Sequence, residues 1–270
     1  MAETIRIQSR ANQHVVRVRR ARDRKEPGEI FVEGVRLVEE SLLSGSRIIF
    51  AVAADDFTAG ERQERLLNTI LERGVDVIEI PKALFHSLAD TANSQGIAIL
   101  AERPQTGPQL FRLSDNEADS KRFLYLDKVS DPSNLGAVMR TAEAAGLGGV
   151  IISPGSADVF SPRALRASMG SSLRLPIWER CAPSECFAWA RNFGLSIVAA
   201  DPSAKKSYTD IDWGLPVLAV FGSEGHGLET SVLAEADEIV AIPMENGVES
   251  LNLAVAVGIV MFEGLRQRKN

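Results

Sequence analysis

Five polar residues on three loops are the groups of this sequence best suited to bind a ligand and act on it. Asn134 and Arg140 follow one predicted strand, Glu224 lies in a glycine-rich loop after a second, and Ser250 and Asn252 follow a third. The carboxyl ends of parallel strands meet at one edge of a sheet, where such folds bind their ligands. The sequence therefore predicts a single site that three loops build together.

The glycines around Glu224 indicate that backbone and ligand approach each other closely. Gly222, Gly225 and Gly227 form the pattern G-x-x-G-x-G, late in the chain. Glycine lets backbone amides and carbonyls reach a flat ligand such as adenine. The dinucleotide pattern G-x-G-x-x-G and the Walker A pattern are both absent from the sequence. A Rossmann cofactor, and with it a nucleotide-dependent oxidoreductase, is therefore disfavoured.

A hydrolase is also disfavoured, although His226 lies close to Ser223 in the same loop. The nucleophile elbow G-x-S-x-G does not occur in the sequence. The other two histidines, His14 and His86, lie in the other half of the chain.

Each polar residue of the three loops also has an ordinary structural interpretation. Ser250 is a good N-cap for a helix to about Gly264, and that helix is apolar or small on nearly every face, which indicates burial on more than one side. Asn134 can cap the helix that follows it. Arg140, six residues later, is expected to face roughly the same side as Asn134, and alone it is typical of a surface ion pair. Only the three loops together favour a functional site.

Strands that alternate with helices position these loops and predict an α/β fold in two domains. In the first part we expect helices at residues 9–24, 61–73 and 82–89 and one that ends at residue 43, with strands at 47–53, 75–80 and 96–101. In the second part we expect strands at 122–126, 149–153, 195–200, 216–221 and 238–244, with helices at 134–145, 162–169, 184–193 and 250–264 and a short one from 228.

The segment between these parts has the composition of a linker, with proline, glycine, serine and aspartate residues. We therefore expect an N-terminal domain at 1–105, a linker at 106–120 and a second domain at 121–270. The near-continuous apolar strands of the second domain are typical of a mostly parallel sheet that is buried on both faces.

The composition is that of a soluble globular protein. Of the 270 residues, 45% are hydrophobic and 24% are charged. No apolar run reaches the roughly 18 residues of a membrane span, and the N-terminus lacks an apolar signal core, so a cytoplasmic protein is expected. Cys181 and Cys186 have no matching pair of cysteines or histidines, so neither a zinc site nor a disulfide framework is expected.

Positive charge is concentrated at the N-terminus of a chain whose net charge is −6. Residues 1–25 hold eight basic and two acidic residues, a balance of +6, which leaves −12 for the remainder. We call this segment the basic N-terminal arm. It favours contacts with a phosphate backbone, although a solvated basic helix without a partner gives the same pattern.

Three stretches occur in order along the chain: Asp131-Pro132-x-Asn134-x-Gly136-x-x-x-Arg140-Thr141-Ala142, then Phe221-Gly222-x-Glu224-Gly225-x-Gly227, then Ile242-Pro243-Met244 with Ser250-Leu251-Asn252. In this order and spacing they resemble the three motifs of the SpoU (TrmH) family of RNA 2′-O-ribose methyltransferases, in the SPOUT class. Residues 161–176 resemble the middle segment of that family, and residues 31–37 its N-terminal substrate-binding domain. Lys128-Val129-Ser130 departs from the pattern, which is expected to carry a glutamine or similar polar residue there.

The resemblance implies a trefoil-knotted α/β catalytic domain with a mostly parallel sheet, preceded by a small L30e-like α/β domain. It implies S-adenosyl-L-methionine as the cofactor, a homodimer formed through the knotted domain, and no metal or membrane. The residues implied at cofactor positions are Ala200, Phe221, Gly222, Ser223, Gly225, Gly227, Ile242, Met244, Ser250 and Leu251.

The resemblance also implies catalytic positions at Asn134, Arg140, Glu224, Ser250 and Asn252. Arg140 would activate the ribose hydroxyl. A guanidinium is a poor base because it stays protonated, so Arg140 is expected to stabilise the developing alkoxide or to orient a phosphate. Its part in proton transfer is left open.

RNA is the implied partner, with contacts expected from Arg17, Arg19, Arg20, Arg36, Arg163 and Arg166. The two-domain layout and the basic arm favour ribosomal RNA, most of all 23S rRNA, over tRNA. Two alternatives stay open: a tRNA 2′-O-methyltransferase, and a non-catalytic RNA-binding or ribosome-assembly factor on the same fold.

Overall fold

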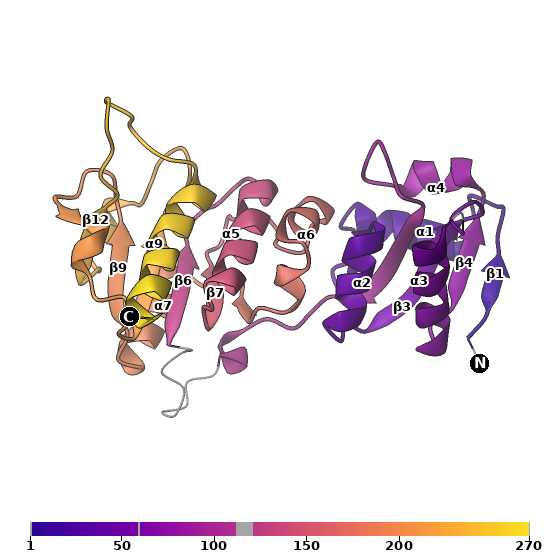
Figure 1. Cartoon of the computed structure of the whole chain (residues 1–270), viewed down its shortest axis with the longest axis horizontal. Coiled ribbons are helices and arrows are strands. Elements are labelled where there is room, and N and C mark those ends of the chain that lie inside the picture. The colour runs from indigo at the N-terminus through magenta and orange to yellow at the C-terminus, as the bar shows by residue number, and fades with distance from the viewer. Residues whose placement is uncertain (1, 59, 112–120, 270) are drawn as a thin grey trace. The chain divides into compact units, whose positions relative to one another are not determined.

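The computed structural model describes residues 2–58, 60–111 and 121–269 of the chain. It divides into two compact units (Figure 1). The first unit comprises Met1–Gln105 and Phe160–Leu173, and the second comprises Thr106–Val159 and Arg174–Asn270. The grouping differs from the expected division in one respect, because Phe160–Leu173 belongs with the first unit although both of its flanks lie in the second. Of the expected linker, the part at 112–120 lies outside the described residues.

The first unit is a five-stranded mixed sheet with helices. Its elements are β1 (Thr4–Arg6), α1 (Gln13–Arg22), β2 (Glu29–Glu33), α2 (Val35–Leu43), β3 (Ile48–Ala54), α3 (Glu61–Glu72), β4 (Val77–Ile80), α4 (Lys82–Leu88), β5 (Ile97–Glu102) and α6 (Pro162–Ser168). The strand order is β1-β4-β3-β5-β2, in which β1, β4 and β3 run parallel and β5 is antiparallel to both of its neighbours.

The basic N-terminal arm is an integral part of this unit. Strand β1, which the sequence pattern does not predict, pairs with β4. Helix α1 begins at Gln13 because the Asn12 side chain accepts a hydrogen bond from the backbone N–H of His14. Val15 and Val18 are only 1% exposed and pack in the core of the unit. Burial of these valines fixes which face of the arginine-rich helix meets solvent.

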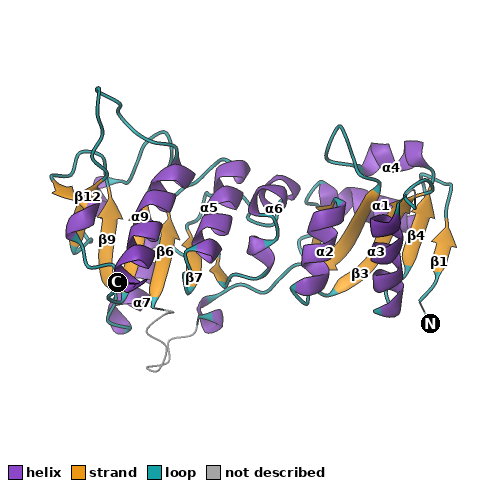
Figure 2. Ribbon diagram, in the orientation of Figure 1, coloured by secondary structure: helices purple, strands orange, loops and turns teal. Residues whose placement is uncertain are grey.

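The second unit is built on seven parallel strands (Figure 2). Its elements are β6 (Arg122–Leu126), α5 (Pro132–Ala144), β7 (Gly149–Ile152), β8 (Ile177–Trp178), α7 (Pro183–Asn192), β9 (Ser196–Ala200), β10 (Lys206–Ser207), β11 (Val217–Phe221), α8 (Thr230–Leu233), β12 (Glu238–Ala241) and α9 (Leu253–Lys269). Among the described residues, short 3-10 turns lie at Pro108–Leu110, Ser171–Leu173 and Tyr208–Asp210. The strand order is β10-β12-β9-β11-β6-β7-β8, and every pairing is parallel. Helices α5 and α9 lie side by side over one face.

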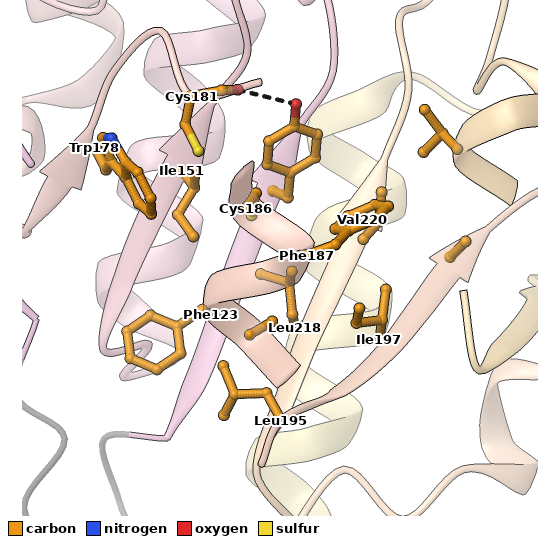
Figure 3. Close-up of a cluster of buried hydrophobic side chains, with 14 of the residues drawn as sticks. Phe123, Ile151, Trp178, Cys181, Cys186, Phe187, Leu195, Ile197, Leu218 and Val220 are labelled. Atoms are coloured by element: carbon orange, nitrogen blue, oxygen red, sulfur yellow. Dashed lines mark hydrogen bonds between the residues drawn. The ribbon is translucent and has the colours of Figure 1, made fainter. Parts of the chain in front are cut away.

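The other face of this sheet carries a cluster of buried apolar side chains (Figure 3). Phe123, Leu218 and Val220 point from β6 and β11 towards Phe187 of α7, and all four are fully buried. The hydroxyl of Tyr125 donates to the carbonyl oxygen of Cys181 at 3.1 Å, and both cysteines of the chain are free and buried. Apolar residues on both faces of the central strands make this sheet a rigid platform for the loops at its edge.

The start of the expected linker is folded rather than extended. The backbone N–H of Gly107 donates to the carbonyl of Ile177 at 2.8 Å. Phe111 is 7% exposed and lies over Phe123 with ring centroids 5.1 Å apart.

Within the described ranges, no helix is long and apolar enough to cross a membrane.

Candidate active site

The first loop leaves β6 and enters α5 through an N-cap at Asp131. The Asp131 carboxylate accepts from the backbone N–H of Ser133 at 2.8 Å, and Pro132 occupies the first helical position, where its fixed backbone angle suits the helix. The expectation that Asn134 caps this helix is therefore wrong. Because the helix begins two residues earlier, the Asn134 side chain is left to make contacts outside the helix.

The third loop ends at Asn252, which is the cap of α9. Its amide oxygen accepts from the backbone N–H groups of Ala254 at 3.0 Å and Val255 at 3.4 Å. The expectation that Ser250 caps this helix is wrong, because Asn252 is an equally good capping residue and lies directly before the first helical turn. Ser250 is exposed in the loop instead.

Asn134, Glu224 and Asn252 form one hydrogen-bond network that joins all three loops. The Asn252 amide nitrogen donates to the Asn134 oxygen at 3.0 Å, and the Asn134 nitrogen donates to a Glu224 carboxylate oxygen at 2.9 Å. Asn134 keeps one N–H and one oxygen lone pair for a ligand. The structure thus brings three of the five expected catalytic residues into contact.

The second loop is a tight turn that only glycine permits. Ser223 and Gly227 exchange backbone hydrogen bonds of 3.2 and 3.0 Å across it. A Cβ atom at Gly222 would lie 2.2 Å from the carbonyl carbon of Gly227, which no side chain tolerates. Gly227 has φ +64°, in the left-handed region that favours glycine. These glycines hold backbone groups of the loop at the wall of a cavity.

This cavity, of about 430 Å³, opens between the ends of β9, β11 and β12. All ten residues expected at cofactor positions line it: Ala200, Phe221, Gly222, Ser223, Gly225, Gly227, Ile242, Met244, Ser250 and Leu251. Glu224 lines it as well, and through Glu224 the hydrogen-bond network reaches the cavity rim.

Sequence reasoning missed several residues of the cavity, most notably the turn after β9. Asp201, Pro202 and Ser203 line the wall, and so do His226 and Glu249 on the other two loops. The signal was available in the sequence, since the predicted strand at 195–200 ends at the same sheet edge as the strands before the three loops.

Arg140 is not among the cavity residues. It is exposed on α5, and it makes no hydrogen bond or ion pair with any residue that the structure describes. Six residues correspond to about 600° of helical rotation, so Arg140 projects about 120° away from Asn134 rather than to the same side. Its guanidinium is available to a ligand that is larger than the cavity.

The arginines expected to bind RNA all lie in the first unit, and they differ in their partners. Arg17 pairs with Glu29 and Arg20 with Glu26, and the hydrogen bond with Glu29 raises the pKa of Arg17. Arg166 lies 2.7 Å from a carboxylate oxygen of Asp90, at an angle outside hydrogen-bond geometry. In contrast, Arg19 and Arg36 form no ion pair with a described residue. Arg163 is exposed on α6 and is also engaged in an interaction.

Over half of the chain, residues 121–262, matches the SpoU rRNA Methylase family. The chain belongs to this family. Residues 31–107 match a second family, described as RNA 2′-O ribose methyltransferase substrate binding. Together the two matches cover most of both units, and they identify the protein as an RNA methyltransferase of the TrmH/SpoU family.

Relatives and solved structures of SpoU-type enzymes match nearly the whole chain. An uncharacterized tRNA/rRNA methyltransferase of Synechocystis is 33% identical over 91% of this chain and 86% of its own length. The 23S rRNA (guanosine(2553)-2′-O)-methyltransferase RlmP of Bacillus subtilis is 28% identical over 95% of this chain and 97% of its own length. The AdoMet-bound structure of an rRNA methyltransferase from Sinorhizobium meliloti is 29% identical and superposes with a TM-score of 0.84 over 97% of this chain and 98% of that one.

The family match fits the fold. The α/β architecture of the second unit, with its parallel seven-stranded sheet, is that of SpoU methyltransferases of the SPOUT class. In the described parts of the chain, no group of three or more histidine, cysteine, aspartate or glutamate side chains could hold a metal ion.

Proposed function

We propose that this SpoU-family protein transfers a methyl group from S-adenosyl-L-methionine to a ribose 2′-hydroxyl of RNA, and that 23S rRNA is its substrate. The observation that carries the proposal is the cavity, because all ten residues at the cofactor positions of the family motifs line it and the Asn134 network reaches its rim. The 23S rRNA 2′-O-methyltransferase activity of the Bacillus subtilis relative RlmP and the AdoMet-bound Sinorhizobium structure support it.

The residues of the cavity fit this cofactor in size and in chemistry. About 430 Å³ lies within the usual range of small-molecule sites, roughly 300–1,000 Å³. Phe221, Ile242 and Leu251 provide apolar walls for an adenine ring, and the glycine turn offers backbone groups to its edges. A side chain at Gly222 would collide with the backbone of Gly227. Glycine at this position therefore leaves the backbone groups of the loop open to contact with a ligand.

When bound, S-adenosylmethionine supplies a methyl group attached to a positively charged sulfur. The ribose hydroxyl oxygen attacks the methyl carbon, and the sulfur is the leaving group. The protein's main task is alignment of oxygen, methyl carbon and sulfur. Asn134 is held from both sides, so its remaining N–H and lone pair can fix the ribose. Arg140, on the exposed side of α5, is free to hold a phosphate bidentately or to stabilise the developing alkoxide.

Replacing Arg140 with alanine tests this assignment. We expect methyl transfer to fall by about 100-fold or more, as when one transition-state donor is removed, while cofactor affinity stays unchanged because Arg140 does not line the cavity. Methyl-labelled cofactor is incubated with unmodified 23S rRNA, and the product is mapped by its alkali-resistant linkage.

The matched control is Arg191→Ala, which removes another exposed arginine of the second unit that pairs with Glu235. It should turn over normally. Normal turnover by the Arg140→Ala variant would contradict the assignment. Label on tRNA but not on 23S rRNA would favour the tRNA alternative, and an absence of cofactor affinity would favour a non-catalytic RNA-binding factor.

We further propose a cytoplasmic homodimer that is formed through the second unit. Val255 and Phe262 are 50% and 46% exposed on α9, and a second copy of the chain would cover them. In the first unit, we propose that Arg19 and Arg36 contact RNA phosphates. Arg17, Arg20, Arg163 and Arg166 join them where RNA competes with their present partners.

A further inference from the structure

The proposed cofactor cavity contains carboxylates that lack counter-charges. Asp201, Glu224 and Glu249 line it, and none of them forms an ion pair with a described residue. Their hydrogen-bond partners are neutral: Asn134 donates to Glu224, and Ser203 donates to Asp201. No lysine or arginine is among the lining residues that the structure describes.

This arrangement is unusual for the second unit, where many surface carboxylates have a basic partner. The pairs are Glu143–Arg174, Glu229–Lys128, Glu235–Arg191, Glu238–Lys206 and Glu263–Arg266. Among the described residues, the cavity lining therefore holds three carboxylates and no lysine or arginine, and it favours a positively charged occupant. Lys205 and Lys206 line an adjoining pocket that shares Glu249 with the cavity.

Cofactor and product differ by one charge at the sulfur atom. In the transfer, an oxygen lone pair forms the new O–C bond, the electrons of the S–C bond remain on sulfur, and the hydroxyl proton passes to solvent. The sulfonium becomes a neutral thioether, whereas the amino and carboxylate groups of the methionine part keep their charges. A negative field at the cavity wall therefore acts on the difference between the two molecules.

We propose that Asp201 and Glu249 make the cavity select the sulfonium cofactor over its neutral thioether product, S-adenosylhomocysteine. The proposal rests on the proposed function, since it presumes the cofactor. The two carboxylates act as specificity determinants. They attract the positively charged sulfonium of the cofactor, and they favour release of the product because its thioether sulfur is neutral.

The expected effect is modest because Glu249 is exposed and Asp201 is half-buried. Coulomb's law, with the dielectric screening found near a protein surface, corresponds to about two- to fivefold in affinity for each carboxylate. Salt weakens it further, because the Debye length falls from about 30 Å at 0.01 M to about 3 Å at 1 M ionic strength.

Calorimetric titration with S-adenosylmethionine and with S-adenosylhomocysteine tests the proposal without any assay of turnover. The variants are Glu249→Gln, Asp201→Asn and the double substitution. Asparagine retains the side-chain oxygen that accepts from Ser203, so the turn after β9 is preserved. Glu245→Gln is the matched control, since Glu245 is exposed on the same loop as Glu249 but does not line the cavity.

We expect the wild type to bind the sulfonium form more tightly. Each single substitution should weaken that form about two- to fivefold, leave the thioether unchanged, and add to the other in the double variant. In the wild type, the preference should also shrink as salt is raised. Equal affinities at low salt, or equal weakening of both ligands in the variants, would overturn the inference. Failure of the wild type to bind either ligand would instead overturn the proposed cofactor, and the inference with it.

Discussion

Asn134 is the residue on which the geometry of the candidate site most depends. Asn252 has its amide oxygen committed to the first N–H groups of α9, so only its nitrogen is left to face Asn134. That nitrogen donates to the Asn134 oxygen and thereby turns the Asn134 nitrogen towards Glu224. The start of one helix thus sets the direction of every hydrogen bond in the network.

Tyr125 provides a residue-scale prediction about pH. Its hydroxyl is fully buried and donates to Cys181, and burial, with the negative charge of Asp127, raises the pKa of Tyr125 far above its ordinary value of about 10. Above pH 10 the unfolded chain ionises this group and the folded chain does not, so the free energy of unfolding should decline as pH rises.

Tyr125→Phe should remove that part of the alkaline decline and, at neutral pH, lower the free energy of unfolding by about 1 kcal/mol through the lost hydrogen bond. Urea unfolding at about pH 8 and about pH 11 measures both effects. Tyr208→Phe, at the only other tyrosine, is the matched control. An alkaline decline that is as steep in Tyr125→Phe as in the wild type would contradict the prediction.

At the scale of elements, α9 links the site to the core of the second unit. It packs along α5, and its first turn carries the Asn252 cap. Two glycines face different neighbours: a Cβ at Gly258 would lie 3.8 Å from the methyl of Thr141, whereas at Gly264 it would lie 2.9 Å from Arg122 and 3.0 Å from Trp213. The same substitution should therefore have opposite effects two turns apart.

Gly258→Ala should stabilise the protein by up to about 1 kcal/mol, because alanine loses less backbone freedom in a helix and meets only ordinary contacts. Gly264→Ala should destabilise it by about 1–3 kcal/mol, because Arg122 and Trp213 are buried and held in place. Urea unfolding of the two variants compares them directly. A Gly264→Ala protein as stable as the Gly258→Ala protein would contradict the prediction, because it would mean that Arg122 and Trp213 move aside at little cost.

At the scale of the whole molecule, the chain passes between its two units three times, at residues 105–106, 159–160 and 173–174. Composition alone predicts a single linker at 106–120. Phe160–Leu173 returns to the first unit in mid-course, and its helix α6 contacts β2 there. Neither unit is thus one continuous segment of sequence, and truncation at the expected linker would divide the first unit.

The exposed face of α9 gives a prediction for the assembly. Val255 and Phe262 are seven residues apart and lie on the same side of the helix. Phe262→Glu places a charge in the proposed interface and should convert a dimer into a monomer, as measured by sedimentation velocity. Leu43→Glu is the control, because Leu43 is 75% exposed in the first unit. A Phe262→Glu protein that remains dimeric would place the interface elsewhere.

Local sequence determined most of the elements of this protein, and the family resemblance named ten of the residues that line its cavity. Apolar strands such as β6 and β11 were placed within a residue, because a run of large aliphatic and aromatic side chains can only be buried. Helix starts were less certain, since several capping residues lie close together and tertiary contacts choose among them, as at Asp131 and Asn252. The three residues of β1 carry no pattern of their own and depend on β4.

The tertiary structure alone decided which of these residues meet. Asn134 lies 90 residues from Glu224 and 118 from Asn252, and the strand order β12-β9-β11-β6 that joins their loops is not the order of the sequence. The absence of Arg140 from the cavity, the return of Phe160–Leu173 to the first unit and the unpaired carboxylates at the cavity wall follow in the same way. Spacing along a chain reports which face of one element a residue occupies, whereas the packing of the whole core determines which faces come together.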